Sequence, residues 1–458
     1  MNIGIIGGGM TGLVLAHRLS LQGHIVTVFE SNKQLGGLAT YHDYGPLVWD
    51  RFYHVILPSD THLINFIQKI GLGEELRWRP TLTGCYINQK LYSISNTIEF
   101  LRFPPLSLIG KLRLAFTLLY GSRIKNWQGL EKITVEDWLL KVSGRNTYEK
   151  LWKPLLLAKL GENYKRVSAV FIWSYIKRLF SARDSSLHKE QFGYVVGGYK
   201  TVFDQLEKLI CSAGGHICTG VTVEHIASHP DSGIWVEHSG KKEHFDKVIF
   251  TGPVNILQHV VAQDLIKISG DRPTVEYMGV ICMVLITRKA LVPYYIVNLA
   301  DQRIPFTGII GMSNLVSLKE TAGLHITYLP KYVLSNDPLL QQPDDELRKL
   351  FFRGLHLIFP ELKADDIVVS HINRAQKMQP LQVLNYSSLV PKIVTEHNDF
   401  FVLNTSQFVN ETLNNNTVVK HVEEFMRKEY MLKREQGAGS REQGAGGIPI
   451  IKIRGLYP

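Results

Sequence analysis

Glycines crowd the start of the chain, and their spacing limits how this segment can fold. Gly7, Gly9 and Gly12 form the pattern G-x-G-x-x-G directly after an apolar run over residues 2–6. The run predicts a short buried strand, and the residues from Gly12 onward predict a helix over 12–21. In such a strand–turn–helix unit, the first glycine makes the turn, the second allows a close backbone approach, and the third lets the helix pack on the strand.

The residues that follow have the features of a dinucleotide site. A second strand is predicted over 25–29, and Glu30 closes it 18 residues after Gly12. Roughly 20 residues are expected before an acid that accepts ribose hydroxyl groups. The turn residues Met10 and Thr11 lead into the helix, whose N-terminus presents backbone N–H groups and a positive dipole end to a pyrophosphate. A carboxylate would repel a 2′-phosphate, so the pattern favours a plain adenosine ribose.

Composition and missing motifs exclude other classes. Hydrophobic residues make up 45% and charged residues 20%, as in globular proteins. Four cysteines without a C-x-x-C pair argue against a disulfide framework or a zinc knuckle, so no metal site is expected. Signal-peptide features and long apolar runs are lacking, which predicts a cytoplasmic protein. Hydrolase and kinase motifs are absent as well.

A second glycine pair, Gly36–Gly37, follows Glu30. With this pair the sequence resembles the flavin-dependent amine oxidase superfamily, which includes protoporphyrinogen oxidases and carotenoid desaturases. The resemblance implies an FAD cofactor whose pyrophosphate is approached by the backbone of Gly36 and Gly37. Many relatives have an arginine directly after the pair, whereas this chain has Leu38. Phosphate neutralisation would then fall on backbone and helix dipole.

No convincing second glycine motif follows, which indicates a single dinucleotide site. The substrate would then supply the electrons, and oxygen or a quinone would accept them, unless the reaction is redox-neutral. Residues 195–200, the predicted helix 202–211 and the segment 221–226 resemble the family's return to the FAD domain. There Val223 would contact the adenine through its backbone. The alternative is a helix and strand that pack only for stability.

The C-terminal region is similar to the third FAD element of the family. A strand is predicted over 400–403, followed by Asn404–Thr405 where relatives carry Gly-Asp, and then by a helix over about 417–428. Asn404 and Thr405 can offer hydrogen bonds to ribityl or phosphate oxygens. The run Asn414–Asn416 suits a helix cap that stabilises negative charge on reduced flavin, or merely the cap of a surface helix.

The resemblance implies an α/β fold, with a Rossmann-type FAD-binding domain and an interleaved α+β substrate domain. The FAD-binding domain is expected from 1–90, 186–270 and 386–430, and the substrate domain from 91–185 and 271–385. The first substrate segment has helical patterns, and the second predicts strands of one sheet over 277–286, 294–299, 308–312 and 325–329. Residues 431–458 contain a near-exact seven-residue repeat and predict a low-complexity, disordered tail.

Two residues of the segment Gly45–His54 are candidates for substrate binding, because relatives pass beneath the flavin here. His54 can bind substrate or shuttle a proton near neutral pH, or it can be a packed core residue. Arg51 suits a ligand carboxylate or phosphate, or it can pair with Asp50 or a surface acid. In this family the flavin itself accepts hydride, so no catalytic side chain is assigned.

The net charge of +10 is uneven, and residues 102–125 hold five basic side chains and no acid. The basic residues are Arg102, Lys111, Arg113, Arg123 and Lys125, and they alternate with Leu108, Ile109, Leu112, Phe116 and Leu119. This pattern suits an interfacial helix that docks peripherally on an anionic membrane, where a lipophilic substrate could enter. The alternative is a helix packed onto the substrate domain with solvated charges.

The sequence therefore predicts an FAD-dependent oxidoreductase of the oxidase or desaturase type, which accepts hydride from an extended, hydrophobic small molecule. One alternative is a redox-neutral flavoenzyme resembling UDP-galactopyranose mutase, and another is a flavin-binding protein without turnover. A nucleic acid partner is not expected.

Overall fold

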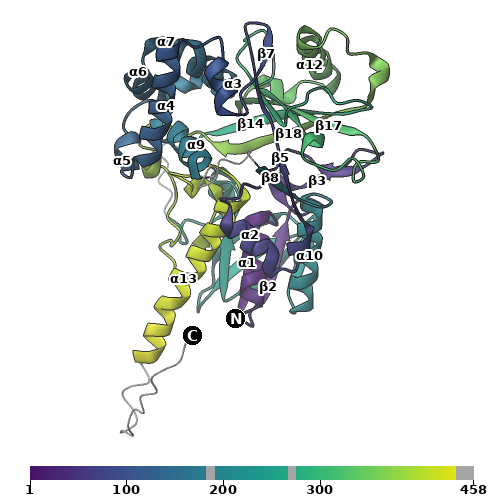
Figure 1. Cartoon of the computed structure of the whole chain (residues 1–458). Coiled ribbons are helices and arrows are strands. Elements are labelled where there is room, and N and C mark those ends of the chain that lie inside the picture. The colour runs from purple at the N-terminus through teal and green to yellow at the C-terminus, as the bar shows by residue number, and fades with distance from the viewer. Residues whose placement is uncertain (182–190, 267–274, 440–458) are drawn as a thin grey trace, which may run out of the picture.

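The computed structural model describes residues 1–181, 191–266 and 275–439. Figure 1 shows two sheet-based regions, one above the other, with a group of helices beside the upper sheet and a long helix, α13 (Asn415–Gly439), running along the lower region. The α/β fold predicted from the sequence is confirmed, since a parallel sheet flanked by helices forms the lower region.

The lower region is built on a five-stranded parallel sheet in the order β19-β13-β1-β2-β9. Its strands are β1 (Asn2–Ile6), β2 (Ile25–Glu30), β9 (His216–Thr219), β13 (Lys247–Phe250) and β19 (Phe400–Val402). Successive side chains point to opposite faces. Ile3 and Ile5 therefore pack toward the helices, whereas Ile6 packs toward a smaller sheet on the other face.

The helices on the first face are α1 (Met10–Ser20), α2 (Thr61–Lys69), α10 (Tyr199–Ser212) and α13. The smaller sheet on the second face is antiparallel and contains β10 (Val223–Ser228), β11 (Ile234–His238) and β12 (Lys241–Phe245). Helix α11 (Val254–Val260) contacts β10. The parallel sheet is thus covered on both sides, as sheets of this kind require.

The upper region is built on a seven-stranded sheet in the order β18-β14-β17-β16-β15-β6-β7. Its strands are β6 (Thr83–Ile87), β7 (Lys90–Ser93), β14 (Tyr277–Thr287), β15 (Ile296–Leu299), β16 (Gly308–Gly311), β17 (His325–Leu334) and β18 (Ile367–Pro380). All eleven residues of β14 are buried. Cys282 and its alternate neighbours face one hydrophobic cluster, and Ile281 and its alternate neighbours face another.

Helices cover both faces of the upper sheet. One face carries the helical group α3 (Thr97–Arg102), α4 (Leu108–Arg123), α5 (Trp127–Leu130), α6 (Val135–Ser143), α7 (Arg145–Thr147), α8 (Lys153–Leu160) and α9 (Ala169–Ser181). The other face carries α12 (Asp344–Ile358). Two ribbons, β3 (Tyr41–Asp43) with β4 (Val48–Asp50) and β5 (Leu76–Pro80) with β8 (Gln191–Val195), lie between the two regions.

The structure adds to and corrects the sequence-based elements. The strands expected over 277–329 do share one sheet. Helix α12 and strand β18 were not predicted. Polar residues such as Asn373 and Arg374 interrupt the apolar pattern of β18. Helix α13 continues past the expected end at Lys428 to Gly439, into the segment expected to be disordered. A docked helix extends at little cost because its nucleus already exists. Residues 440–458 lie outside the described residues.

The expected division into two domains stays a prediction. The boundary placed at residue 90 falls at the start of β7, which pairs with β6 in the upper sheet. The boundaries placed near residues 186 and 270 fall on 182–190 and 267–274, outside the described residues. Among the helices of the described ranges, none has both the length and the apolar composition to cross a membrane.

Candidate functional site

The first glycine loop joins β1 to α1 and leaves no room for side chains at Gly7, Gly8 and Gly12. Gly7 has a φ of +115°, and a Cβ there would meet Thr251 Oγ1 at 2.5 Å. A Cβ on Gly12 would lie 1.9 Å from the Gly7 carbonyl oxygen. Gly7 N donates to Phe29 O at 2.8 Å, which ties the loop to β2. Gly7 and Gly12 thus shape the turn and allow α1 to approach the strand.

Gly9 differs from Gly7 and Gly12, because a side chain at this position would point toward the loop that contains Gly37. It is the N-cap of α1, and within 4 Å a Cβ on it would meet, among the described residues, Gly37 Cα alone, at 3.8 Å. Met10 and Thr11 begin the helix and are buried, and its first turn carries no acidic residue. A helix N-terminus of this kind offers backbone N–H groups and a positive dipole end to an anion.

The second glycine pair lies against the first loop. Gly36 N donates to Gly8 O at 2.8 Å. Gly36 has a φ of +107°, and a Cβ there would lie 2.4 Å from the Phe203 ring. Gly37 has a φ of +56°, and its Cβ would lie 3.2 Å from Gly9 Cα. Residues 7–12 and 36–37 therefore form one surface of bare backbone at the start of α1, which we call the glycine cradle.

Glu30 ends β2 beside the glycine cradle and helps to hold it. Its Oε2 accepts a hydrogen bond from Gly8 N at 2.8 Å, and its Oε1 accepts from Asn32 N and Asn32 Nδ2, both at 2.8 Å. The residue is only 6% exposed. Oε1 also accepts from Ser31 Oγ at 3.3 Å, whereas among the described residues Oε2 accepts from Gly8 N alone. Because each carboxylate oxygen has about two lone-pair sites, Glu30 can bind the loop and still accept a ligand hydroxyl through Oε2. The spacing predicted an acid here, but not its bond to Gly8.

The segment that contains Val223 lies next to the end of β2. Val221 N donates to Glu30 O at 2.9 Å, and Gly220 N donates to Asn32 O at 2.9 Å. Val223 itself starts β10 and is buried, and a β-bulge follows it. The fold thus brings Val223 close in space to Glu30, although 193 residues separate them in the chain.

Asn404 and Thr405 follow β19, and they differ in how far their side chains are already used. Asn404 is buried, its Oδ1 accepts from Ser406 N at 3.0 Å, and its Nδ2 donates to Gly252 O at 2.9 Å. The amide therefore joins the ends of β19 and β13. Thr405 is half-buried and lines a small pocket with Gln379, Gln382 and Phe408. Of the two, Thr405 is the more available to a ligand.

The asparagine run before α13 has divided roles. Asn414 Oδ1 accepts from Thr417 N at 2.9 Å, so Asn414 caps the helix as predicted. Asn416 Oδ1 instead accepts from Leu63 N at 3.0 Å. Asn415 Nδ2 is buried and has no hydrogen-bond partner among the described residues. The start of α13 is therefore fastened to α2 through Asn416.

Asp50 and His54 meet Tyr199 between the two regions of the molecule. Asp50 is 3% exposed, and its Oδ1 accepts from Tyr199 N, at the first turn of α10, at 2.9 Å. His54 Nδ1 lies 3.6 Å from Asp50 Oδ2 and has no hydrogen-bond partner among the described residues, and its ring lies 5.0 Å from that of Tyr199. His54 is thus partly packed, between a carboxylate and an aromatic ring.

Arg51 does not pair with Asp50, contrary to one alternative from the sequence. Its Nε donates to Asn373 Oδ1 at 3.2 Å, and its Nη2 donates to Arg374 O at 3.4 Å. Asn373 Nδ2 in turn donates to Tyr44 OH and to Arg51 O, both at 3.1 Å. The guanidinium is therefore tied to β18, an element that the sequence analysis did not predict.

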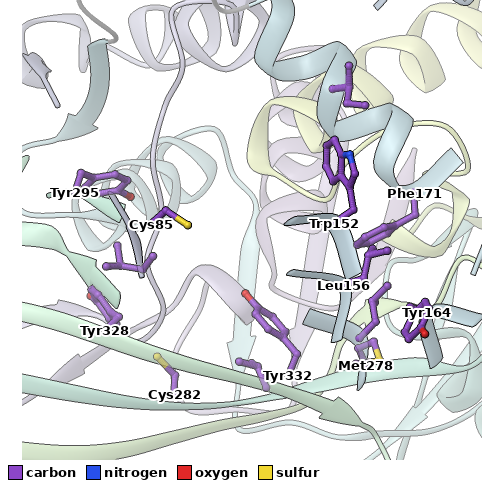
Figure 2. Packing of buried hydrophobic residues seen from close by; sticks show 14 of the residues in the cluster. Cys85, Trp152, Leu156, Tyr164, Phe171, Met278, Cys282, Tyr295, Tyr328 and Tyr332 are labelled. Atoms are coloured by element: carbon purple, nitrogen blue, oxygen red, sulfur yellow. The ribbon is translucent and has the colours of Figure 1, made fainter. Parts of the chain in front are cut away.

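Aromatic residues that the sequence analysis did not assign to the site pack between the helical group and the upper sheet. Figure 2 shows Tyr328 and Tyr332 on the sheet, with Trp152 and Leu156 on the helical side, nearer to Tyr332. The hydroxyl groups of Tyr332 and Tyr53 are 2.8 Å apart. Burial raises the pKa of both tyrosines, so both stay neutral. We call this region the aromatic interior.

A lysine enters the aromatic interior from α8. Lys159 Nζ lies 3.1 Å from the centre of the Tyr332 ring. Among the residues that the structure describes, no acid pairs with it, and burial lowers the pKa of Lys159 to about 7. A lysine of this kind can hold or release a proton near neutral pH. Its position could not be predicted, because α8, β17 and the Tyr53 segment are distant in the sequence.

The cysteines show no sign of a metal site. Among the described residues, no group of three or more His, Cys, Asp or Glu side chains is placed to hold a metal ion. Cys85 and Cys282 are buried, and burial raises the pKa of the Cys85 thiol to about 12 and that of Cys282 further. Both thiols therefore act as small apolar groups of the core.

Comparisons with known proteins agree with this arrangement. Residues 10–374 match the model of the family described as flavin containing amine oxidoreductase. Mitochondrial protoporphyrinogen oxidase from Nicotiana tabacum is 28% identical over 145 residues, which cover 31% of this chain and 28% of the tobacco protein.

Two solved structures share the fold over nearly the whole chain. An oxidoreductase from Methanosarcina mazei has a TM-score of 0.71 at 18% identity, covering 93% of this chain and 100% of that one. A reduced UDP-galactopyranose mutase has a TM-score of 0.69 at 16% identity, covering 93% and 95%. At such identities the likeness concerns the fold alone.

Proposed function

Because the chain belongs to the flavin-containing amine oxidoreductase family, we propose that it is an FAD-dependent oxidoreductase acting on an extended, hydrophobic small molecule. The observation that carries the proposal is the glycine cradle at the start of α1, with the Glu30 carboxylate beside it. Two loops without side chains beside a helix N-terminus suit a pyrophosphate, and a neighbouring carboxylate suits a ribose.

The proposed cofactor contacts follow from this placement. The backbone of Gly7, Gly9, Met10, Thr11 and Gly12 would face the phosphates together with that of Gly36 and Gly37. Glu30 would accept the ribose hydroxyl groups, and the backbone at Val223 would face the adenine. Near the flavin end, Thr405 would donate to the ribityl chain or a phosphate, while Asn404 holds the loop through Gly252.

When bound, FAD would accept hydride from a substrate C–H bond, and oxygen or a quinone would later take the two electrons. The residues of this chain would bind and orient the substrate and exclude water from it. The aromatic interior suits an apolar substrate, since burial of apolar surface there is favourable. Arg51 and His54 are proposed substrate contacts, with Arg51 held by Asn373 and His54 lying 3.6 Å from Asp50.

The test is an anaerobic titration of the purified protein with candidate polyenes, porphyrinogens, amines and sugar nucleotides. Loss of the oxidised flavin absorbance on adding one of the first three, and its return with air or a quinone, would support the proposal. One alternative is a redox-neutral enzyme resembling UDP-galactopyranose mutase, with which the chain shares its fold. Turnover of a sugar nucleotide only after reduction of the flavin would establish it. A coloured protein that none of these compounds changes would be a flavin-binding protein without turnover.

A further inference from the structure

Helix α4 presents its large apolar side chains to solvent. The exposed fractions are 67% for Leu108, 69% for Ile109, 64% for Leu112, 56% for Phe116, 39% for Leu119 and 45% for Tyr120. Side chains of this kind are normally buried, and single exceptions need no explanation, whereas a contiguous group of them marks an interaction site.

The opposite face of α4 is the one that packs on the protein. Gly110, Leu114, Thr117 and Gly121 are buried. A Cβ on Gly121 would lie 3.3 Å from Ile176 of α9, and Thr117 Oγ1 lies 2.8 Å from Ser143 Oγ of α6. At about 100° per residue, the exposed apolar side chains span an arc of about 120° that excludes these positions. Helix α4 is therefore packed onto the helical group, as the alternative from the sequence has it, but through this narrow face, while its large apolar side chains stay exposed.

Helix α3 extends the apolar surface. Ile98 is 63% exposed and Leu101 is 53% exposed. Lys111 Nζ donates to Leu101 O at 2.6 Å, which fastens the end of α3 to α4. We call Ile98, Leu101 and the six exposed residues of α4 the apolar patch. It lies on the outer side of the helical group, which Figure 1 shows beside the upper sheet.

The charges along α4 and its flanks have one sign, and the one acid of α3, Glu99, is bonded through its carboxylate to Ser93 and Ser95. Arg102, Arg113, Arg123 and Lys125 are exposed, and Lys111 is half-buried. No acidic residue occurs between residues 102 and 125. On the helix, Lys111 and Arg113 lie at either border of the apolar arc, since about 100° separates successive residues. Apolar side chains bordered by basic ones are typical of a helix that lies in a lipid–water interface.

We propose that the apolar patch docks this protein on an anionic lipid bilayer, with α4 lying in the plane of the interface. Helix α4 has 16 residues. At about 1.5 Å per residue it is roughly 24 Å long, less than the ~30 Å hydrocarbon core, and only one of its faces is apolar. A second copy of this chain is a poorer partner, because it would bring basic residues against basic residues at the same border.

Vesicle flotation of the purified full-length protein tests the docking. Vesicles of phosphatidylcholine alone are compared with vesicles in which about a third of the lipid is phosphatidylglycerol. The double variant Leu112→Ser/Phe116→Ser removes the centre of the apolar patch. The matched control is Leu21→Ser/Leu357→Ser, because these leucines are 65% and 50% exposed outside the patch. Circular dichroism and light scattering of each variant report the fold and the oligomeric state.

We expect the wild type and the control to float with anionic vesicles, and the patch variant to bind at least tenfold more weakly. Replacing Arg113, Arg123 and Lys125 together by Gln should remove most of the preference for anionic lipid, at about fivefold for each charge. Failure of the wild type to bind vesicles would overturn the proposal. So would a stable dimer that the patch variant converts to a monomer. Neither outcome depends on the flavin, so the proposed function is tested separately.

Discussion

The glycine cradle and the aromatic interior are built in opposite ways. The cradle uses backbone from two loops within the first 37 residues, and its contacts follow directly from which residues are glycines. The aromatic interior brings together side chains from distant segments, including Tyr53, Lys159 and Tyr332. A site made of local backbone can therefore be recognised in a sequence, whereas a site made of distant side chains needs the fold.

The largest loss of stability and of bound flavin is expected for a substitution at Gly12, where the glycine cradle has no room for a side chain. In Gly12→Ala the new Cβ would lie 1.9 Å from Gly7 O, so loop and helix must separate. We expect the free energy of unfolding to fall by about 3 kcal/mol and the protein to be purified without flavin. Gly129→Ala is the control, because an added Cβ meets nothing described within 4 Å there. Equal flavin content in both variants would contradict the role of the glycine cradle in binding the cofactor.

A smaller loss of flavin affinity is expected when the glycines are kept and the neighbouring carboxylate of Glu30 is neutralised. Glu30→Gln replaces the carboxylate that accepts from Gly8 N and Asn32 N with an amide, which can accept at one atom only. Flavin affinity should fall about tenfold, since a hydrogen bond to a charged group contributes about 1.5 kcal/mol or more. Titration of the flavin-free protein with FAD measures this. Glu207→Gln, at an exposed position of α10, should leave the affinity unchanged.

In the aromatic interior, a substitution should change how the stability of the fold depends on pH rather than the flavin content. Burial lowers the pKa of Lys159 to about 7 from the ordinary 10.5, so between these values the unfolded chain binds more protons than the folded protein. The lysine therefore destabilises the fold increasingly as the pH falls from 10.5 to 7, and fully below 7.

Lys159→Met should accordingly raise the melting temperature by about 2 °C near neutral pH and by much less near pH 10. The exposed Lys208→Met is the control. Melting curves of the two variants across this pH range would sharpen the comparison. A gain for Lys159→Met that did not change with pH would contradict the burial of an unpaired charge.

The smallest effect concerns one hydrogen bond of the aromatic interior. Tyr53→Phe removes the bond between the Tyr53 and Tyr332 hydroxyl groups, and it should lower the free energy of unfolding by about 1 kcal/mol. Because the two residues share this bond, adding Tyr332→Phe should cost less than its effect alone. Tyr120→Phe, on the exposed face of α4, should be neutral. Strictly additive losses at Tyr53 and Tyr332 would show that the bond does not form in solution.

The sequence was sufficient for the elements that local pattern determines. Apolar runs separated by glycines predicted β1, α1 and β2 close to their observed bounds, and the acid at the end of β2 followed from spacing. The family resemblance assigned Val223 a backbone contact with the adenine, which stays a prediction; the structure places the Val223 segment against the end of β2. These features are recognisable because backbone conformation and strand periodicity leave a local trace in the sequence.

The rest depended on contacts between distant segments. The partner of Arg51 is Asn373 on β18. The polar residues of β18 interrupt the alternating apolar pattern by which a strand is recognised in a sequence. Asp50 binds the start of α10 rather than its neighbour Arg51. The outward apolar face of α4 could not be told from an inward one, because the direction is decided by small residues such as Gly121 packing on α9.

The most direct test of the central claim is to release the cofactor from the full-length protein and identify it by chromatography and mass. We expect FAD, in a ratio of one per chain for the wild type and Gly129→Ala, and close to none for Gly12→Ala. FMN in place of FAD, no flavin even after reconstitution, or undiminished FAD in Gly12→Ala would contradict the claim that the glycine cradle holds a dinucleotide.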